Sequence, residues 1–169
     1  PGGGIGPSQE IYREVEKTRS QKKIITSMGS VAASGGYYIA SACEGIIANP
    51  GTITGSIGVI MEYANIEEVV KKIGISPVVI KSGKFKDAGS PFRELGEEER
   101  QVLQDLVDEL HRQFVADAAK ARKIPLATMA GLADGRIYTG QKALQLKLID
   151  RLGNLDDAVA WAGELANIQ

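Results

Sequence analysis

The chain has 169 residues, enough for one compact domain with a substantial hydrophobic core. Hydrophobic residues make up 43% of it and charged residues 24%, which is the usual composition of a globular protein. Its formal net charge of −1 excludes a broadly basic surface, so we expect no nucleic-acid partner. Its single cysteine, Cys43, excludes an intrachain disulfide, and no zinc-ligand spacing occurs in the sequence.

The predicted elements alternate between helices and strands along the first half of the chain. The glycine-rich start reads as the middle of a turn, so we expect an upstream segment, with a membrane anchor and the first strands, that is missing from this sequence. Ser8 is the expected N-cap of the first helix, with Glu10 in its first turn. In chain order the pattern predicts a helix over 8–20, a strand over 22–28, a helix over 35–43, a strand over 46–48 and a β-branched, strand-like segment over 52–61.

From residue 66 onward the predicted elements are mostly helices. A helix over 66–73 and a strand over 76–81 precede the longest predicted helix, 97–122, whose apolar residues recur at helical spacing. Three shorter helices follow over 126–132, 141–146 and 156–166, the last with Asn154 as its N-cap. The alternation predicts an α/β layered fold with parallel strand pairing, in a single domain over residues 1–169.

Ser34 is the most informative residue of the chain. It lies in the run Ala33-Ser34-Gly35-Gly36, where a strand-like segment gives way to a helix-like one. The glycines let the backbone turn sharply and leave an uncrowded N–H beside the hydroxyl, which suits a nucleophile whose oxyanion is held by main-chain donors. A serine between small residues is also common in tight turns, and the G-x-S-x-G elbow is absent because position 32 is alanine.

A nucleophilic serine needs a general base, and a lysine is the expected choice here. The only histidine, His111, lies in the longest predicted helix, where we expect a structural or interfacial role. Lysines cluster in the run 81–87, and Lys86 stands beside an aromatic residue and near small ones that could enclose a neutral amine. The adjacent Asp87 would favour the ammonium form unless it points away. Lys84 competes with Lys86 as the base, and such a cluster can equally be a solvated loop.

Two further segments could complete such a site. Ser56, in the run Gly55-Ser56-Ile57-Gly58, could hold a neutral lysine through its hydroxyl without adding a negative charge, but a glycine-kinked strand with an incidental serine has the same pattern. The consecutive glycines of Pro1-Gly2-Gly3 could direct backbone N–H groups at an oxyanion. Phosphate binding is not expected, because Pro7 replaces the third glycine of G-x-G-x-x-G and no Walker pattern occurs.

Together these segments resemble one family, the signal peptide peptidase A family of serine–lysine membrane peptidases, within the ClpP/crotonase superfamily. The matching runs lie in order along nearly the whole chain: Pro-Gly-Gly at 1–3, Ala-Ser-Gly-Gly-Tyr-Tyr at 33–38, Thr-Gly-Ser-Ile-Gly at 54–58, Ser-Gly-Lys-Phe-Lys-Asp at 82–87 and Gly-Arg-Ile-Tyr-Thr-Gly-Gln-Lys-Ala-Leu at 135–144. The resemblance implies ClpP/crotonase-like β-β-α layers with a C-terminal helical part. It also implies that no metal or organic cofactor is needed.

The resemblance implies a role for each site residue. Ser34 corresponds to the nucleophile, and Lys86 corresponds to the general base in preference to the other lysines of the cluster. Ser56 corresponds to the hydroxyl that orients the lysine, and the N–H groups of Gly35 and Gly2 correspond to the oxyanion-hole donors. Lys86 would take the proton of Ser34 during attack on a peptide carbonyl and then protonate the leaving amine.

The implied biological role is that of a serine endopeptidase that degrades remnant signal peptides, or other unfolded hydrophobic peptides, after preprotein processing. The short form of the family implies a homo-oligomeric ring, with an octamer as a candidate size, in which serine and lysine meet across a subunit boundary. The catalytic domain is expected on the extracytoplasmic side of the cytoplasmic membrane, held by an N-terminal anchor outside this sequence.

Three other functions stay open at this point. A crotonase-like acyl-CoA enzyme shares glycine-rich oxyanion donors, but it typically uses carboxylates and needs neither Ser34 nor Lys86. A non-catalytic scaffold would use the fold for assembly alone, with no need to keep both residues. A related serine–lysine membrane protease, acting on stomatin-like partners or phage capsid proteins, is less favoured because the Ala-Ser-Gly-Gly-Tyr-Tyr run favours signal peptide peptidase.

Overall fold

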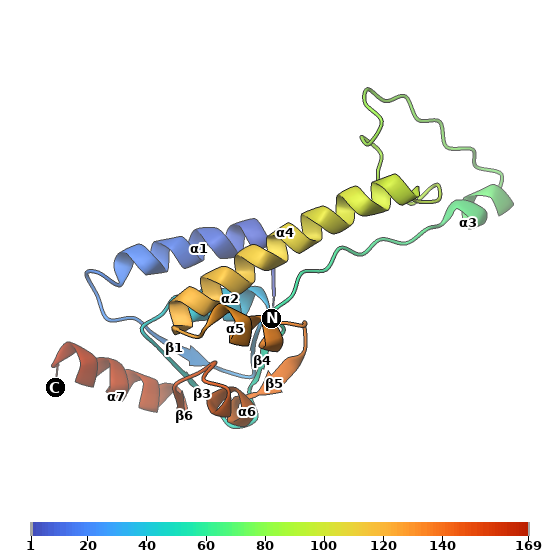
Figure 1. The fold of residues 1–169 in the computed structure, drawn as a ribbon. Coiled ribbons are helices and arrows are strands. Elements are labelled where there is room, and N and C mark those ends of the chain that lie inside the picture. The colour runs from blue at the N-terminus through green and yellow to red at the C-terminus, as the bar shows by residue number, and fades with distance from the viewer. Residues whose placement is uncertain (1, 169) are drawn as a thin grey trace. The chain divides into compact units, whose positions relative to one another are not determined.

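The computed structural model describes residues 2–168, which form two compact units. The first unit contains the residues up to Val59 and those from Leu110 onward, and the second contains residues 60–109. The longest helix, α4 (Glu97–Arg122), contributes residues to both units (Figure 1). The single domain expected over 1–169 stays a prediction.

The strands of the first unit form two small sheets. These strands are β1 (Ile25–Met28), β2 (Val31–Ala33), β3 (Gly45–Ala48), β4 (Ile53–Gly55), β5 (Ile137–Thr139) and β6 (Arg151–Leu152). The first sheet has the order β1-β3-β6, with both pairings parallel. The second has the order β2-β4-β5, in which β2 and β4 are parallel and β5 is antiparallel. All four residues of β3 are buried, as expected for a parallel strand with a neighbour on each side.

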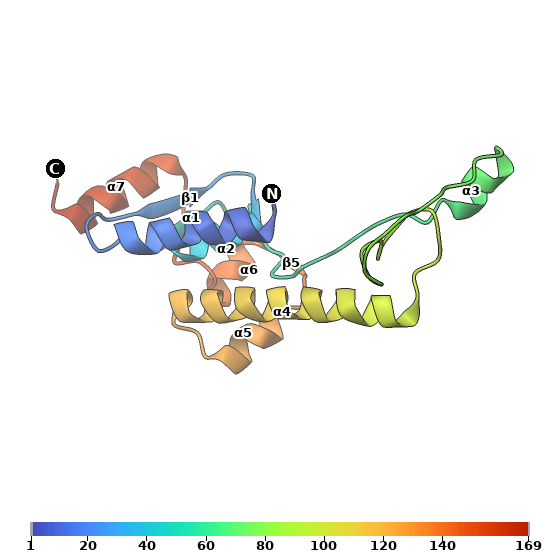
Figure 2. The ribbon, with the colours of Figure 1, turned by 90° about the horizontal axis from the view of Figure 1, so that it is seen from above.

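Helices pack around these strands. The helices of the first unit are α1 (Ile5–Thr18), α2 (Gly35–Ser41), the second half of α4, α5 (Leu126–Leu132), α6 (Gly140–Gln145) and α7 (Leu155–Ala166). The helix α1 runs alongside the second half of α4 (Figure 2), where the Tyr12 hydroxyl donates a hydrogen bond to the Asp117 carbonyl at 3.1 Å. The helix α7 packs on the first sheet through Ala158 and Trp161, which cluster with Ile47 of β3.

Aromatic side chains fill the centre of the first unit. Tyr12, Tyr38 and Phe114 have no exposed surface, and they come from α1, α2 and α4. The Tyr38 ring stacks on Phe114 with the ring centroids 4.3 Å apart, and it meets Tyr12 at 5.3 Å. Burying a large side chain of this kind contributes about 1.5–3 kcal/mol, so α2 is held firmly against the two longer helices.

The start of the first helix differs from the prediction. The helix α1 begins at Ile5 with Gly4 as its N-cap, and Ser8 lies buried one turn later. The Ser8 hydroxyl donates a hydrogen bond to the Gly4 carbonyl at 2.9 Å instead of capping the helix. Pro7 fits within the first turn because an N–H there has no intrahelical acceptor. The helix therefore begins before this proline, and Glu10 lies beyond the first turn.

The C-terminal helices agree closely with the sequence. Both α4 and α5 have the predicted bounds, and Asn154 caps α7 as expected. The Asn154 side chain accepts hydrogen bonds from the N–H groups of Asp156 and Asp157, and the Asp157 carboxylate accepts one from the Asn154 N–H at 2.8 Å. Among residues 2–168, no helix combines the length and the apolar character that a membrane crossing requires.

The second unit contains α3 (Glu67–Lys72), the first half of α4 and the connection between them. The strand predicted over 76–81 is wrong, because this segment is irregular. Its β-branched residues favour an extended strand, but Val78 and Ile80 are 86% and 96% exposed. No strand pairs with the segment within residues 2–168, and a lone strand can neither complete a hydrogen-bond ladder nor bury one face.

Candidate active site

Ser34 occupies the turn between β2 and α2. Its backbone has φ 54° and ψ −122°, a conformation that residues other than glycine rarely adopt. Its N–H donates a hydrogen bond to the Gly55 carbonyl at 2.8 Å, and its carbonyl accepts one from the Tyr38 N–H at 2.9 Å. The half-buried side chain makes no capping bond to α2. A strained strand-to-helix turn that leaves the serine hydroxyl uncommitted is the geometry of a nucleophile elbow.

The two tyrosines that follow the glycines hold this turn in place. Tyr37 is fully buried, and its hydroxyl donates a hydrogen bond to the Leu148 carbonyl at 3.0 Å. Burial raises the pKa of Tyr37, so its hydroxyl stays protonated and keeps its role as donor. The Tyr38 hydroxyl donates to the Asp117 carboxylate at 2.6 Å. Strain at Ser34 can persist because these anchors fix the helix that follows it.

The N-terminal glycines lie directly against this turn. A Cβ atom added at Gly2 would lie 3.0 Å from Ser34 Cβ and 3.1 Å from Ser34 Oγ. A Cβ added at Gly35 would lie 2.5 Å from Ser8 Oγ and 3.1 Å from the Gly3 backbone nitrogen. The structure therefore brings together Ser34, Gly35 and Gly2, the predicted nucleophile and the two predicted oxyanion-hole residues. At positions 2 and 35, only glycine fits without displacing its neighbours.

Ser56 lies at the same edge of the second sheet as Ser34. The parallel register pairs Ala33 with Gly55, so Ser34 and Ser56 are the next residues on two neighbouring strands. Neighbouring strands lie about 4.8 Å apart. Ser56 has φ 50°, and its N–H donates a hydrogen bond to the Arg136 carbonyl at 2.8 Å. The carboxyl ends of β2 and β4 thus present two serines side by side.

Lys86 belongs to the second unit, so the predicted dyad is divided between the two units. It lies in a series of turns, where its N–H donates a hydrogen bond to the Gly83 carbonyl at 3.4 Å. Its side chain is exposed, and within residues 2–168 it has no carboxylate within ion-pair distance. The enclosed setting considered from the sequence is therefore not present around this lysine within its own unit.

The other lysines of the cluster are engaged with acidic groups. Lys84 pairs with Glu98, and its ammonium lies 5.3 Å from the centre of the Phe85 ring. Lys81 donates hydrogen bonds to the Asp87 carboxylate and to the Lys84 carbonyl. A carboxylate partner and an aromatic face both favour the ammonium form of a lysine. Lys84 and Lys81 thus each have a carboxylate partner, which Lys86 lacks among residues 2–168.

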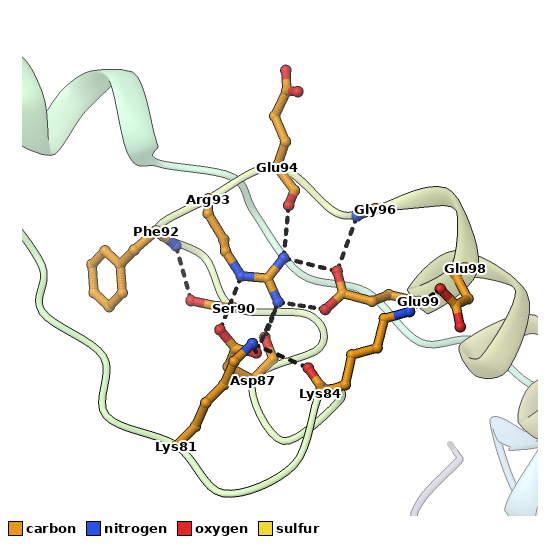
Figure 3. A network of polar contacts seen from close by, with 10 residues as sticks. All are labelled: Lys81, Lys84, Asp87, Ser90, Phe92, Arg93, Glu94, Gly96, Glu98 and Glu99. Carbon is orange, nitrogen blue, oxygen red and sulfur yellow. Dashed lines mark hydrogen bonds and ion pairs between the residues drawn. The ribbon is translucent and has the colours of Figure 1, made fainter.

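An arginine that the sequence analysis does not single out organises this part of the second unit (Figure 3). The Arg93 Nε donates a hydrogen bond to the Asp87 carboxylate at 3.0 Å, and its Nη1 donates to the Glu99 carboxylate at 2.8 Å. Chiefly through Arg93, the pKa of Asp87 is held well below its usual range and that of Glu99 falls to about 2. The Asp87 carboxylate thus faces Arg93 and Lys81.

Two further residues with reactive side chains carry no sign of chemistry. Burial raises the pKa of the Cys43 thiol, which is the opposite of what a nucleophilic thiol needs, and this side chain accepts a hydrogen bond from Thr26 at 2.9 Å. His111 is half-buried on α4, and its Nε2 has no hydrogen-bond partner within residues 2–168. Neither residue belongs to the group around Ser34 described above.

A solved structure of a membrane-bound stomatin-specific protease has the same fold. It superposes with a TM-score of 0.56 at 16% sequence identity, over 95% of this chain and 64% of that chain. At this level of identity the likeness shows the fold alone. The predicted α/β class with ClpP/crotonase-like layers is confirmed.

Relatives in sequence that are named as proteases match nearly the whole chain. A provisionally named protease of Synechocystis sp. is 48% identical over 168 residues, which are 99% of this chain and 61% of the relative. A provisionally named signal peptide peptidase SppA of Enterococcus faecium is 41% identical over 160 residues, which are 94% of this chain and 46% of the relative. The chain thus spans only about half the length of these relatives.

The model of peptidase family S49 matches residues 16–169, a range that contains Ser34, Ser56 and Lys86. The chain therefore belongs to peptidase family S49. The resemblance to the signal peptide peptidase A family is confirmed at the level of the family. The roles of the individual site residues stay predictions.

Proposed function

We propose that this chain is the catalytic part of a serine endopeptidase that uses a dyad of Ser34 and Lys86. The observation that carries the proposal is the conformation of Ser34, at a strained turn with the Gly2 backbone against its side chain. A residue other than glycine in such a conformation costs about 1–3 kcal/mol. Strain of this size at a serine beside two glycines is typical of the turn that carries a nucleophile.

The proposed reaction is acyl transfer to water. The neutral amine of Lys86 takes the proton of Ser34 Oγ while the oxygen attacks a peptide carbonyl, and a tetrahedral oxyanion forms. The N–H groups of Gly35 and Gly2 donate hydrogen bonds to this oxyanion, and each such donor contributes a factor of about 10²–10³ in rate. Lys86 then protonates the leaving amine. It next activates a water molecule that releases the acyl group from Ser34.

Ser56 is proposed to hold the lysine amine in place. A neutral amine needs hydrogen-bonding partners that bring no negative charge, because a carboxylate would favour the ammonium form. The register of β2 and β4 supports this role, since it places Ser56 beside Ser34 at the same sheet edge. An amine that approaches the Ser34 hydroxyl would therefore meet the Ser56 hydroxyl as well.

Remnant signal peptides and other unfolded hydrophobic peptides are the proposed substrates. Membership of peptidase family S49 supports peptide hydrolysis, and the name of the Enterococcus faecium relative supports the substrate class. We also propose action at the cytoplasmic membrane, on its extracytoplasmic side. The proposed assembly is a homo-oligomeric ring in which Ser34 of one subunit meets Lys86 of its neighbour.

Labelling and hydrolysis measurements test the dyad directly. A fluorophosphonate probe should label Ser34, and both Ser34→Ala and Lys86→Ala should abolish hydrolysis of a hydrophobic peptide. Lys84→Ala is the matched control, because it removes a nearby lysine that already pairs with Glu98. Full activity of the Lys86→Ala protein would contradict the assignment of the base, and labelling elsewhere than Ser34 would contradict that of the nucleophile.

Mixing the two inactive variants tests the shared dyad. Mixed oligomers of the Ser34→Ala and Lys86→Ala proteins contain boundaries at which an intact serine can meet an intact lysine, so some activity should return. Subunit exchange is followed separately with fluorescently labelled protein. Exchange without any recovery of activity would show that the dyad lies within one subunit.

A further inference from the structure

Asp87 directly follows the proposed base, Lys86, in the chain. A carboxylate on the adjacent residue, if it had no other partner, would stabilise the ammonium form of the lysine. In the structure the Asp87 carboxylate is occupied on both oxygens. Its Oδ2 accepts a hydrogen bond from Arg93 Nε at 3.0 Å, and its Oδ1 lies 2.9 Å from Arg93 Nη2.

Arg93 binds the backbone at this position as well as the side chain. Its Nη2 donates a hydrogen bond to the Asp87 carbonyl at 3.1 Å, and its Nη1 donates one to the Glu94 carbonyl at 3.0 Å. One guanidinium therefore fixes the main chain immediately after Lys86 and draws the neighbouring carboxylate toward itself (Figure 3). Arginine suits this task because its five donors lie in a rigid plane.

The other side of Arg93 is attached to the beginning of α4. Its Nη1 donates a hydrogen bond to Glu99 Oε2 at 2.8 Å, and the same oxygen accepts one from the Gly96 N–H at 3.0 Å. Glu99 is only 7% exposed, so this contact is shielded from competing water. The chain of contacts runs from the first turn of a long helix through Glu99 and Arg93 to Asp87.

We propose that Arg93 is a positioning residue for Lys86: by holding Asp87 it keeps that carboxylate from pairing with the lysine and fixes the backbone beside it. This inference rests on the proposed function, in which Lys86 must lose its proton to act as the base. Arg93 then acts through Asp87 and touches neither substrate nor reacting atoms. Its contribution is to keep the neutral form of Lys86 accessible near neutral pH.

Several other charged groups lie around this network and enter the expected pH dependence. Lys81 donates a second contact to Asp87 Oδ1, and Lys84 pairs with Glu98 nearby. Glu67 and Lys71 of α3 pair with each other at 2.7 Å and line the same cavity of about 350 Å³ as Asp87 and Arg93. Lys81 keeps its own contact to Oδ1 when Arg93 is removed. The oxygen released by such a change is therefore Oδ2.

The experiment compares pH profiles of kcat/KM for hydrolysis of one hydrophobic peptide. The variants are Arg93→Gln, Asp87→Asn, the two combined, and Arg100→Gln as a matched control. Arg100 is an exposed arginine of the same unit whose weak pair with Glu97, at 3.9 Å, does not involve Asp87. Circular dichroism and the mass of the native assembly establish that each variant is folded and assembled before its activity is compared.

Arg93→Gln is expected to raise the apparent pKa of the ascending limb by about one unit, since a nearby opposite charge shifts a pKa by about 1–3 units when close. Below that pKa, kcat/KM of the Arg93→Gln protein should be about tenfold lower than that of the unmodified protein. At alkaline pH the two values should approach each other. Adding Asp87→Asn should restore the profile, because the released carboxylate is then gone. Arg100→Gln should leave the profile unchanged.

Two outcomes would overturn the inference. A uniform loss of activity at every pH in Arg93→Gln, not restored by Asp87→Asn, would show that Arg93 only supports the fold. If Arg93→Gln does not fold, Asp87→Asn alone decides. It should lower the apparent pKa, because Lys81 loses its carboxylate partner and Arg93 keeps only Glu99; an unchanged or raised value contradicts the inference. The proposed function fails separately: it is wrong if Lys86→Ala is active, whatever the profile of the Arg93 variants.

Discussion

Gly2→Ala is expected to slow the reaction of Ser34 without unfolding the chain. The added Cβ atom would lie 3.0 Å from Ser34 Cβ and 3.1 Å from Ser34 Oγ. Two carbon atoms are most stable at about 3.5–4.0 Å, so either the backbone at Gly2 or the Ser34 side chain must move by a few tenths of an ångström. That movement disturbs a predicted oxyanion donor and the predicted nucleophile together.

The size of the effect follows from what the two groups contribute. Loss of one oxyanion donor costs a factor of about 10²–10³ in kcat, and a misplacement of about 1 Å can cost about 100-fold. A smaller movement at both groups should therefore lower kcat/KM by about 10- to 100-fold, or about 1.4–2.7 kcal/mol of transition-state stabilisation. Gly2 is exposed, so the free energy of unfolding should change by less than about 1 kcal/mol.

Gly3→Ala is the matched control for this prediction. It makes the same substitution in the same segment, but a Cβ at position 3 would have no atom within 4 Å. The rate of fluorophosphonate labelling at Ser34 and the hydrolysis of a peptide are measured for both variants, together with their thermal unfolding. Equal labelling rates in the two variants would refute the reasoning, because the contact between Gly2 and Ser34 would then have no bearing on the nucleophile.

Three other predictions concern stability. Ser34→Gly should be inactive yet more stable than Ser34→Ala by about 1 kcal/mol in denaturant unfolding, because glycine relieves the strain at φ 54° at some cost in chain entropy; equal stability would mean that the turn is not strained. Tyr37→Phe leaves the Leu148 carbonyl without its donor and should cost about 1–3 kcal/mol, measured in the same way. Contact with Arg93 lowers the pKa values of Asp87 and Glu99. The two ionised carboxylates should therefore stabilise the fold fully above their unfolded-state pKa values of about 4, and this stabilisation should be lost as the pH falls toward 2. Proteolysis within residues 81–99 should accelerate over that range, and Glu99→Gln should reduce the dependence.

The regular elements differ in how well their sequences predict them. The helix α4 can be predicted at both ends because its apolar residues recur over 26 positions, and α7 because Asn154 and Asp157 form a complete capping box. The strands β5 and β6 have three and two residues, which carry almost no periodicity. Their existence depends on partners far away in the chain, such as the pairing of Ile47 with Arg151. The segment 76–81 shows the converse, since β-branched residues form no strand without such a partner.

The candidate site divides in a similar way. The residues around Ser34 predict a serine at a strand-to-helix junction. They do not predict the positive φ of Ser34, because serine normally avoids that conformation. That Gly2 lies against Ser34 depends on how α1 packs on α2, which short-range patterns do not encode. Arg93 is missed for a different reason: Asp87 and Glu99 each lie six residues from it, a spacing that matches neither a helix nor a strand.

The strain at the two serines has a common origin in the second sheet. Ser34 and Ser56 have φ values of 54° and 50°, and each directly follows one member of the pair Ala33 and Gly55. Two strained residues of this kind together cost about 2–6 kcal/mol, a large share of the stability of an ordinary domain. Glycine at either position would remove this cost. The proposed roles of the two hydroxyls, as the nucleophile and as the partner of the lysine amine, would account for a residue other than glycine at both positions.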